Sequence, residues 1–106
     1  MKGFPNGMQH FMKQYNQLQT KIKKLQEDLQ LREFSATSGG GAVMVTVKDK
    51  KIETIKIAKD VFESADCELL QDLVKVATNE ALTQCHLTTD QEMEKLTGKM
   101  SLPGIF

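Results

Sequence analysis

The stretch from Met8 to Arg32 constrains the fold most strongly, because its apolar residues repeat with the period of one helix face. The gaps between them alternate between three and four residues, the a/d heptad pattern of a helix that buries one narrow seam. No glycine or proline interrupts the stretch. At about 1.5 Å per residue, the predicted helix is about 37 Å long. That is long for a domain this small, so part of the helix is expected to project or to pack on a second chain. The seam residues are Met8, Phe11, Tyr15, Leu18, Ile22, Leu25 and Leu29.

The charges of this helix are of one sign as far as Gln26. From Met1 to Gln26 the chain contains lysines and no acidic residue. The stretch from Asp60 to Leu96 is strongly acidic, although the whole chain has a formal net charge of zero. Zero net charge argues against a polycationic nucleic-acid binder. The asymmetry, however, is typical of a protein that binds an anion at one end and stays soluble through the other.

Length and composition indicate one domain. A chain of 106 residues with 40% hydrophobic residues can bury a core, and is small enough for a dimer interface to add to its stability. The two cysteines, Cys67 and Cys85, are about 27 Å apart if one helix carries both, so no disulfide is expected between them. No apolar run has the length of a membrane span, and no signal peptide is recognisable. We therefore expect a cytoplasmic protein.

The middle of the chain predicts three short strands. Phe34 to Thr37 can form the first, and the glycines of Ser38-Gly39-Gly40-Gly41 a turn. A phosphate-binding loop is disfavoured there because a strand follows the glycines, not a helix. Alternating valines predict a strand from Ala42 to Lys48, and Ile52 to Ile57 returns antiparallel, with Ile55 and Ile57 opposite Thr54 and Lys56.

Lysines gather at the tip of this hairpin. They are Lys48, Lys50 and Lys51. A solvated turn is the ordinary interpretation of such residues, and a second contact with an anion is the alternative.

The last third of the chain predicts a helical region. Ala58 to Ser64 is expected to link it to the sheet, with Ser64 or Asp66 as its N-cap. The capping boxes at Thr88 and Thr89 leave open whether residues 66 to 98 form one helix or two. We expect the helix to end near Gly98, and residues 1–7 and 100–106 to be flexible tails. The expected buried stripe is Leu70, Leu73, Ala77 and Ala81, widened by Leu69 and Val76.

Catalytic chemistry is not indicated anywhere in the sequence. The histidines, His10 and His86, lie in different predicted helices without a nucleophile or acid-rich motif around them. Neither histidine nor cysteine occurs at metal-ligand spacing. We therefore predict a protein that is no enzyme, has no metal or cofactor and uses no small-molecule substrate.

Several segments together resemble the YbaB/EbfC family of small bacterial nucleoid-associated proteins. One is the Gln/Met/Lys-rich start of the first helix, Met8-Gln9-His10-Phe11-Met12-Lys13-Gln14. Another is Ser38-Gly39-Gly40-Gly41 followed by Val43-Met44-Val45-Thr46-Val47. A third is Leu69-Leu70-Gln71-Asp72-Leu73-Val74 followed by Ala77-Thr78-Asn79-Glu80-Ala81. The last is the ending Gly98-Lys99-Met100-Ser101-Leu102-Pro103-Gly104. The resemblance covers nearly the whole chain.

The resemblance implies one α+β domain over residues 1–106, with a long N-terminal helix, a three-stranded antiparallel sheet and a C-terminal helical region. It also implies a tweezer-like homodimer in the nucleoid that binds duplex DNA through protruding helices, with low or modest sequence specificity. This chain departs from that pattern in its acidic late helix and in Ala58-Lys59-Asp60, where relatives often have an Asp-Pro turn.

The polar back of the first helix is the expected DNA surface. Lysines and amides on an exposed helix suit phosphate contacts, which position a protein without reading sequence. The candidate residues are His10, Lys13, Gln17 and Lys24 on this back, Lys23 beside them, and Lys21, which flanks the seam. A small dimeric chaperone or adaptor that binds a protein partner is the alternative, which the acidic second half and the apolar tail permit.

Overall fold

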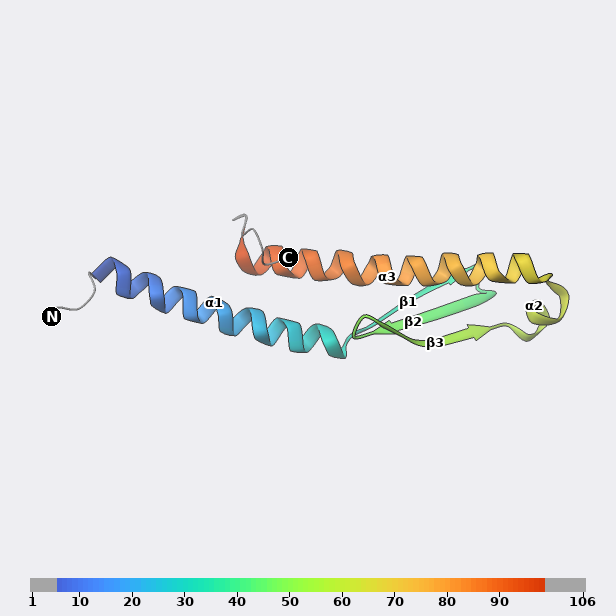
Figure 1. The fold of residues 1–106 in the computed structure, drawn as a ribbon, viewed down its shortest axis with the longest axis horizontal. Coiled ribbons are helices and arrows are strands. Elements are labelled where there is room, and N and C mark those ends of the chain that lie inside the picture. Colours follow the sequence, from blue (N-terminus) through green and yellow to red (C-terminus); the bar gives the residue numbers. More distant parts are fainter. Residues whose placement is uncertain (1–5, 99–106) are drawn as a thin grey trace.

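The computed structural model describes residues 6–98, which form two long helices and a small sheet (Figure 1). The predicted α+β arrangement of a long N-terminal helix, a three-stranded antiparallel sheet and a C-terminal helical region is confirmed. In chain order the elements are α1 (Asn6–Leu31), β1 (Glu33–Ser38), β2 (Val43–Lys48), β3 (Lys51–Ile57), α2 (Lys59–Ser64) and α3 (Cys67–Thr97).

The sheet has the order β1-β2-β3, and both strand pairs are antiparallel. Its register puts Ala36, Val45 and Ile55 side by side on one face, and Ser35, Thr46 and Thr54 on the other. The register shifts between Thr46 and Val47, so that one extra residue of β3, Glu53, forms a bulge. The prediction that Ile55 and Ile57 lie opposite Thr54 and Lys56 is confirmed.

The core lies between α3 and the valine face of the sheet. Val43, Val45 and Val47 of β2 are fully buried, and Ala77 and Ala81 of α3 are buried against them. Two small residues one turn apart let the helix backbone approach the sheet closely. Because α3 packs on β1 and β2 but little on β3, the core occupies only part of the valine face.

Two tight turns fix the strand register. In the β1–β2 turn Gly39 has φ +61°, and a Cβ there would lie 2.9 Å from a methyl carbon of Leu73, so this position requires glycine. The hydroxyl of the neighbouring Ser38 donates a hydrogen bond to the Leu73 carbonyl. In the β2–β3 turn Asp49 and Lys50 both have positive φ, as a two-residue hairpin turn of type I′ demands.

The late helical region is one continuous helix, which decides between the two alternatives left open by the sequence. The Asp66 carboxylate accepts a hydrogen bond from the Leu69 amide at 2.7 Å and caps α3. The Thr89 hydroxyl does not cap a new helix: it donates to the Cys85 carbonyl one turn back. The segment expected to be a link, Ala58 to Ser64, contains the short helix α2. Asp60 stands in its first turn, where the helix dipole favours an acidic side chain.

Two further predictions need correction. Leu69 and Val76 do not widen the buried stripe of α3: they are 49% and 53% exposed, because they lie on its flank beyond the sheet. Residues 6 and 7 belong to α1 and not to a flexible N-terminal tail. The remainder of the predicted tails, residues 1–5 and 100–106, lies outside the described residues.

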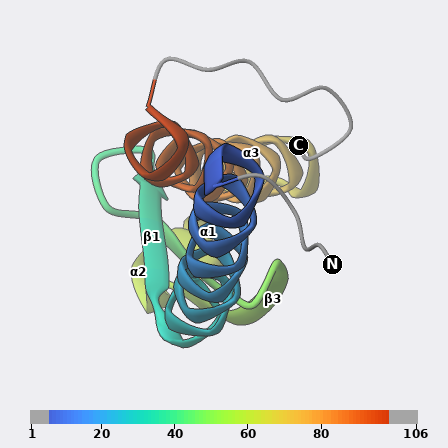
Figure 2. The same ribbon diagram turned by 90° about the vertical axis from the view of Figure 1, so that its left-hand side faces the viewer.

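The N-terminal part of α1 projects away from the sheet and from α3 (Figure 1). In Figure 2, viewed from that end, α1 lies in front of the other elements. The radius of gyration is 20.9 Å, where about 13 Å is typical of a compact domain of this size. The C-terminal part of α1, which includes Gln26 and Leu29, meets α3. One ion pair at this junction joins Arg32 to Glu92 at 3.8 Å.

Candidate nucleic-acid interface

The residues predicted to contact DNA are all presented by α1, and all are exposed. Lys13, Gln17 and Lys21 lie along one shallow, open depression of the helix surface. Gln9, Asn16 and Thr20 line the same depression with amide and hydroxyl groups. His10, Lys23 and Lys24 are exposed nearby on the same helix. The structure therefore brings Lys13, Gln17 and Lys21 together on one continuous surface.

This surface is positively charged and not neutralised by neighbours. Ion pairs within residues 6–98 involve Arg32, Lys75 and Lys95 as the cations. Within the described residues, none of these ion pairs involves a lysine of α1. The first acids along α1 are Glu27 and Asp28, near its C-terminal end. A row of unpaired ammonium groups on an exposed helix can contact phosphate oxygens without first breaking ion pairs.

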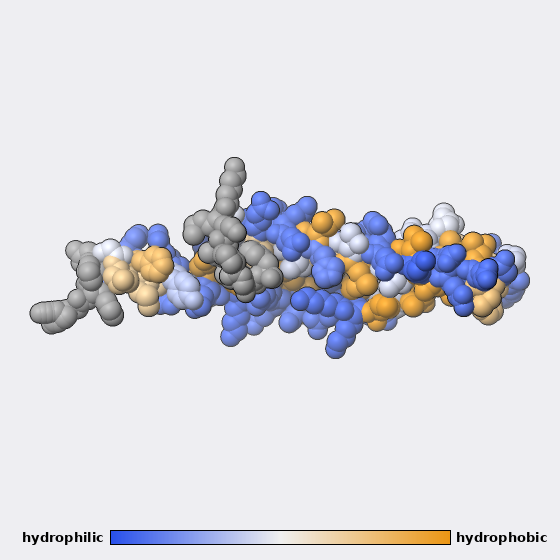
Figure 3. Space-filling view, turned by 45° about the horizontal axis from the view of Figure 1, so that its top comes forward, coloured by the Kyte–Doolittle hydropathy of each residue, from blue (hydrophilic) through white to orange (hydrophobic). Residues whose placement is uncertain are grey.

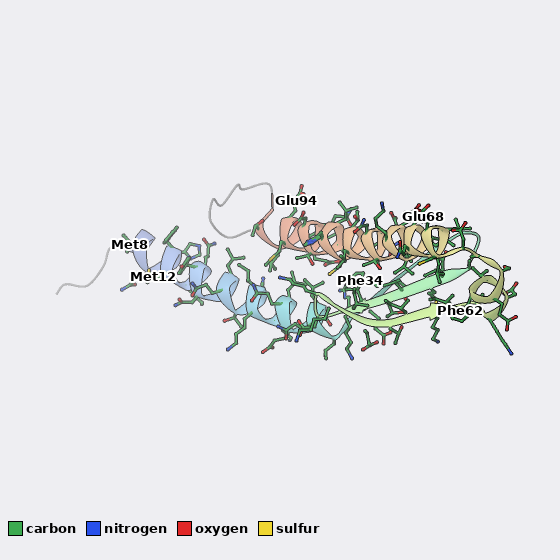
Figure 4. The ribbon with its side chains drawn as sticks, turned by 45° about the vertical axis from the view of Figure 1, so that its right-hand side comes forward. Met8, Met12, Phe34, Phe62, Glu68 and Glu94 are labelled. Atoms are coloured by element: carbon green, nitrogen blue, oxygen red, sulfur yellow. The ribbon has the colours of Figure 1, made fainter. Side chains whose placement is uncertain are left out.

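The apolar seam of α1 is only partly covered in the single chain. Met8, Phe11 and Tyr15 are 45%, 60% and 48% exposed. Leu18, Ile22 and Leu25, nearer the body, are half-buried. Figure 4 shows Met8 and Met12 at the projecting end of α1, away from the sheet. The exposed part of the seam is thus available for a second chain.

The outer surface of α3 has the opposite charge. Glu68 and Glu94 point outward near its two ends (Figure 4). Exposed apolar residues interrupt these acids: Leu69, Val76 and Leu87 are separated by 7 and 11 residues, close to whole numbers of turns, and so lie on one line along the helix. Orange patches among the blue surface of α3 and the sheet are visible in Figure 3.

A hollow of about 450 Å³ lies where the end of α1, the β2–β3 turn and α3 meet. Its lining includes Cys85, His86 and Asp90 of α3, which could suggest chemistry. Cys85 is buried, however, and no hydrogen bond or ion pair links these three side chains in the described part of the chain. No cluster of potential metal ligands occurs among residues 6–98 either. The hollow is the junction of the two helices with the hairpin.

Some residues with a role at this junction were not found from the sequence. The Arg32 guanidinium lies 3.0 Å from the Asp28 carboxylate and also pairs with Glu92, which Lys95 contacts at 3.8 Å. The Arg32–Asp28 spacing of four residues is a recognisable helix pair. The contact with Glu92 is not recognisable from sequence, because it depends on the angle between two distant helices.

None of the helices in the described segment has the length and hydropathy needed to cross a bilayer.

Comparisons with known proteins agree with this arrangement. A nucleoid-associated protein of Clostridium kluyveri is 44% identical over 110 residues, covering 98% of this chain and 96% of that protein. A nucleoid-associated protein of Clostridium acetobutylicum is 43% identical, covering 97% and 96%. The crystal structure of an uncharacterized Helicobacter pylori protein has the same fold, with a TM-score of 0.72 at 16% identity, and covers 91% of this chain and 100% of that one.

The family model for the YbaB/EbfC DNA-binding family matches residues 3–100, nearly the whole chain. Membership of a DNA-binding family agrees with the expectation of a protein that is no enzyme. By this match and by its relatives, the chain belongs to the YbaB/EbfC DNA-binding family.

Proposed function

We propose that this protein is a nucleoid-associated homodimer that binds duplex DNA through α1. The observation that carries the proposal is the lysine surface of a projecting helix in a chain of a DNA-binding family. Its contact residues are Lys13, Lys21, Lys23 and Lys24, with His10 and Gln17 beside them. Relatives named nucleoid-associated proteins support the same cellular place for this chain.

The homodimer is supported by apolar surface that a single chain leaves open. Phe11 at the projecting end of α1 is one such residue. Ile52, Ile55 and Ile57 form another such surface. The register pairs them with the buried valines of β2, yet they are 37–48% exposed because α3 packs little on β3. Large contiguous apolar surface of this kind is typical of an association site. A second copy is the partner that the unbroken heptad seam fits.

Low or modest sequence specificity follows from the chemistry of the surface. Flexible ammonium groups neutralise phosphates, which are the same in every duplex, and so carry no base information. Arginine, a bidentate reader of guanine, does not occur among the candidate contacts, and Gln17 is the one amide there that can read a base edge. The proposed dimer therefore binds many sequences with similar affinity, and its binding weakens steeply as salt rises.

A gel-shift titration on two unrelated duplexes at two salt concentrations tests this proposal. The expected result is similar affinity for both duplexes and loss of affinity at the higher salt. Light scattering of the same sample is expected to give about twice the 11.9 kDa chain mass. Absence of salt-sensitive binding to either duplex contradicts the DNA function, and a clean 11.9 kDa species contradicts the dimer.

An adaptor that binds a protein partner is the second candidate. One observation favours it: Leu69, Val76 and Leu87 are exposed on the acidic helix α3. This surface repels DNA and suits a partner with basic and apolar side chains. The same titration discriminates the two functions, because an adaptor shows no salt-sensitive affinity for duplexes.

A further inference from the structure

The face of the sheet opposite α3 is a surface that the proposed DNA site on α1 does not use. We name it the open face. The register places three residues of each strand on it, and the hydroxyls of Ser35 and Thr46 lie 3.1 Å apart there. Among residues 6–98, α3 is the helix that packs extensively on the sheet, and it covers the other side. The open face consists of Glu33, Ser35, Thr37, Met44, Thr46, Lys48, Lys51, Thr54 and Lys56.

The chemistry of the open face is that of neither a core nor an apolar interface. Met44 is its one large apolar side chain, whereas the opposite face has a valine or isoleucine at most positions of β2 and β3. Serine and threonine hydroxyls occupy its centre. Lysines lie at both ends, and Glu33 is the one acid in the regular register, since Glu53 sits in the bulge. The surface thus offers ammonium and hydroxyl donors together.

Two of these lysines are held directly opposite each other. Lys48 and Lys51 are register partners, and the two-residue turn between them fixes that pairing. Like charges at opposed positions of a sheet repel and destabilise the pair. Glu33 is the register partner of Lys48 on the other side, yet in the described part of the chain no carboxylate lies within ion-pair distance of Lys48, Lys51 or Lys56. A bound anion relieves the repulsion between the two lysines.

The spacing of the open face suits a phosphate backbone. Lys48 and Lys56 are separated by about four residues of strand, or about 14 Å at about 3.4 Å per residue. Phosphates of one DNA strand follow one another about every 3.4 Å along the helix axis, so several fall within this length. The hydroxyls of Ser35 and Thr54 are exposed between the lysines and are ordinary donors to phosphate oxygens, whereas Thr46 is buried and its hydroxyl contacts that of Ser35.

We propose that the open face, with Lys48, Lys51 and Lys56 as its cations, is a second phosphate-binding surface for duplex DNA. The inference rests on the proposed function for its ligand, but it assigns contacts to a part of the molecule other than α1. Phosphate contacts on a flat sheet surface add affinity and leave sequence preference unchanged. The protein then binds DNA through two separate sets of lysines, whose contributions to the salt dependence add.

The test is a fluorescence-anisotropy salt series with one labelled duplex and four full-length proteins. These are wild type, an α1 variant (K13Q/K21Q/K23Q/K24Q), an open-face variant (K48Q/K51Q/K56Q) and the two sets combined. The matched control is K59Q/K75Q/K95Q, which removes three lysines from α2 and α3 and changes the net charge as much as the open-face variant does. Circular dichroism and light scattering check that each variant keeps its fold and mass.

The open-face variant is expected to lower the slope of log K against log salt by about 0.9 for each phosphate that is no longer neutralised, while the control keeps the wild-type slope. The α1 variant should retain weak, salt-dependent binding that the combined variant loses. An open-face variant that behaves like the control overturns the inference and leaves the α1 site standing. A wild type without salt-dependent binding overturns both. An α1 variant with unchanged binding beside a defective open-face variant supports the inference and moves the main site to the sheet.

Discussion

The two long helices of this protein have similar lengths and opposite roles. α1 has 26 residues, no buried side chain in the described part and a regular apolar seam. α3 has 31 residues and buries Ala77, Ala81, Cys85, Met93 and Thr97. The helix with the clearer heptad pattern is therefore the one that projects, and the helix with the weaker pattern builds the core. A regular apolar pattern indicates that a helix face will be buried, but it does not indicate which partner buries it.

The weak periodicity of α3 has a structural cause. Its first half packs on the sheet through Ala77 and Ala81, whereas its second half faces α1 through residues such as Met93. The buried face therefore changes partner along the helix, and one stripe of 3.6-residue period cannot describe both halves. The projecting α1 has no such change, and its seam stays in register from end to end.

The largest expected effect comes from disrupting the packing of α3 in the core. Ala81→Asp places a charge in a site that is fully buried against the valines, without a partner. The loss in the free energy of unfolding is expected to approach the whole stability of a small domain, about 5–15 kcal/mol. Thermal unfolding followed by circular dichroism measures it.

The control for this change is Thr83→Asp on the exposed side of the same helix, which is expected to alter stability by no more than about 0.5 kcal/mol. Equal melting temperatures for the two variants would show that α3 does not carry the core.

The next effect sharpens the role of α1. Leu18→Asp or Ile22→Asp introduces an unpaired charge into the half-buried seam and is expected to dissociate the proposed dimer. Light scattering should then give about 11.9 kDa for these variants. Asn16→Asp adds the same charge on the other side of α1 and should leave the dimer mass intact. A dimer that persists in both seam variants places the interface elsewhere, with the isoleucines of β3 as the next candidates.

A smaller effect concerns the docking of α3 on the β1–β2 turn. Gly39→Ala combines backbone strain of about 1 kcal/mol with a clash on Leu73 that adds about another 1–3 kcal/mol. Gly40 has φ +67° but no neighbour within 4 Å, so Gly40→Ala is expected to show the strain alone. Urea midpoints of the two variants measure the difference. If Gly40→Ala is as unstable as Gly39→Ala, the close approach of Leu73 contributes nothing.

The smallest effect is expected at the junction of the two helices. Arg32 and Glu92 are partly exposed and 3.8 Å apart, and such pairs contribute at most about 1 kcal/mol. A double-mutant cycle of Arg32→Ala and Glu92→Ala gives their coupling from urea unfolding. A coupling well above this value would mean that the ion pair, and not apolar packing, fixes α1 against α3.

Local patterns in the sequence predicted the elements of the fold well. Alternation of Val43, Val45 and Val47 placed β2 and its buried face, and the regular seam placed α1. Thr89 misled because a threonine can bond to the carbonyl one turn back as readily as it can cap. Leu69 and Val76 misled because helix period does not show how far a narrow sheet extends beneath a helix.

The candidate site was predictable to the same extent. Exposure of Lys13, Lys21 and Lys24 followed from their place outside the seam. The opposition of Lys48 and Lys51 on the open face depends on strand register and on a turn with two positive φ angles at non-glycine residues, Asp49 and Lys50. The pair Asp49-Lys50 does not predict that turn from sequence, as the pair Asn-Gly would. Both cysteines are free, as their predicted distance along one helix required.

The most direct test of the difference between the two helices compares their lysines in the same DNA-binding measurement. A fluorescence-anisotropy salt series is run on wild type, on the α1 variant K13Q/K21Q/K23Q/K24Q and on the control K59Q/K75Q/K95Q, with two unrelated duplexes. The α1 variant is expected to bind both duplexes more weakly, by the same factor, with a slope lower by about 0.9 for each phosphate that is no longer neutralised. The control is expected to match wild type. An α1 variant that keeps the wild-type affinity and slope contradicts the account, because the projecting helix would then not be the DNA-binding one.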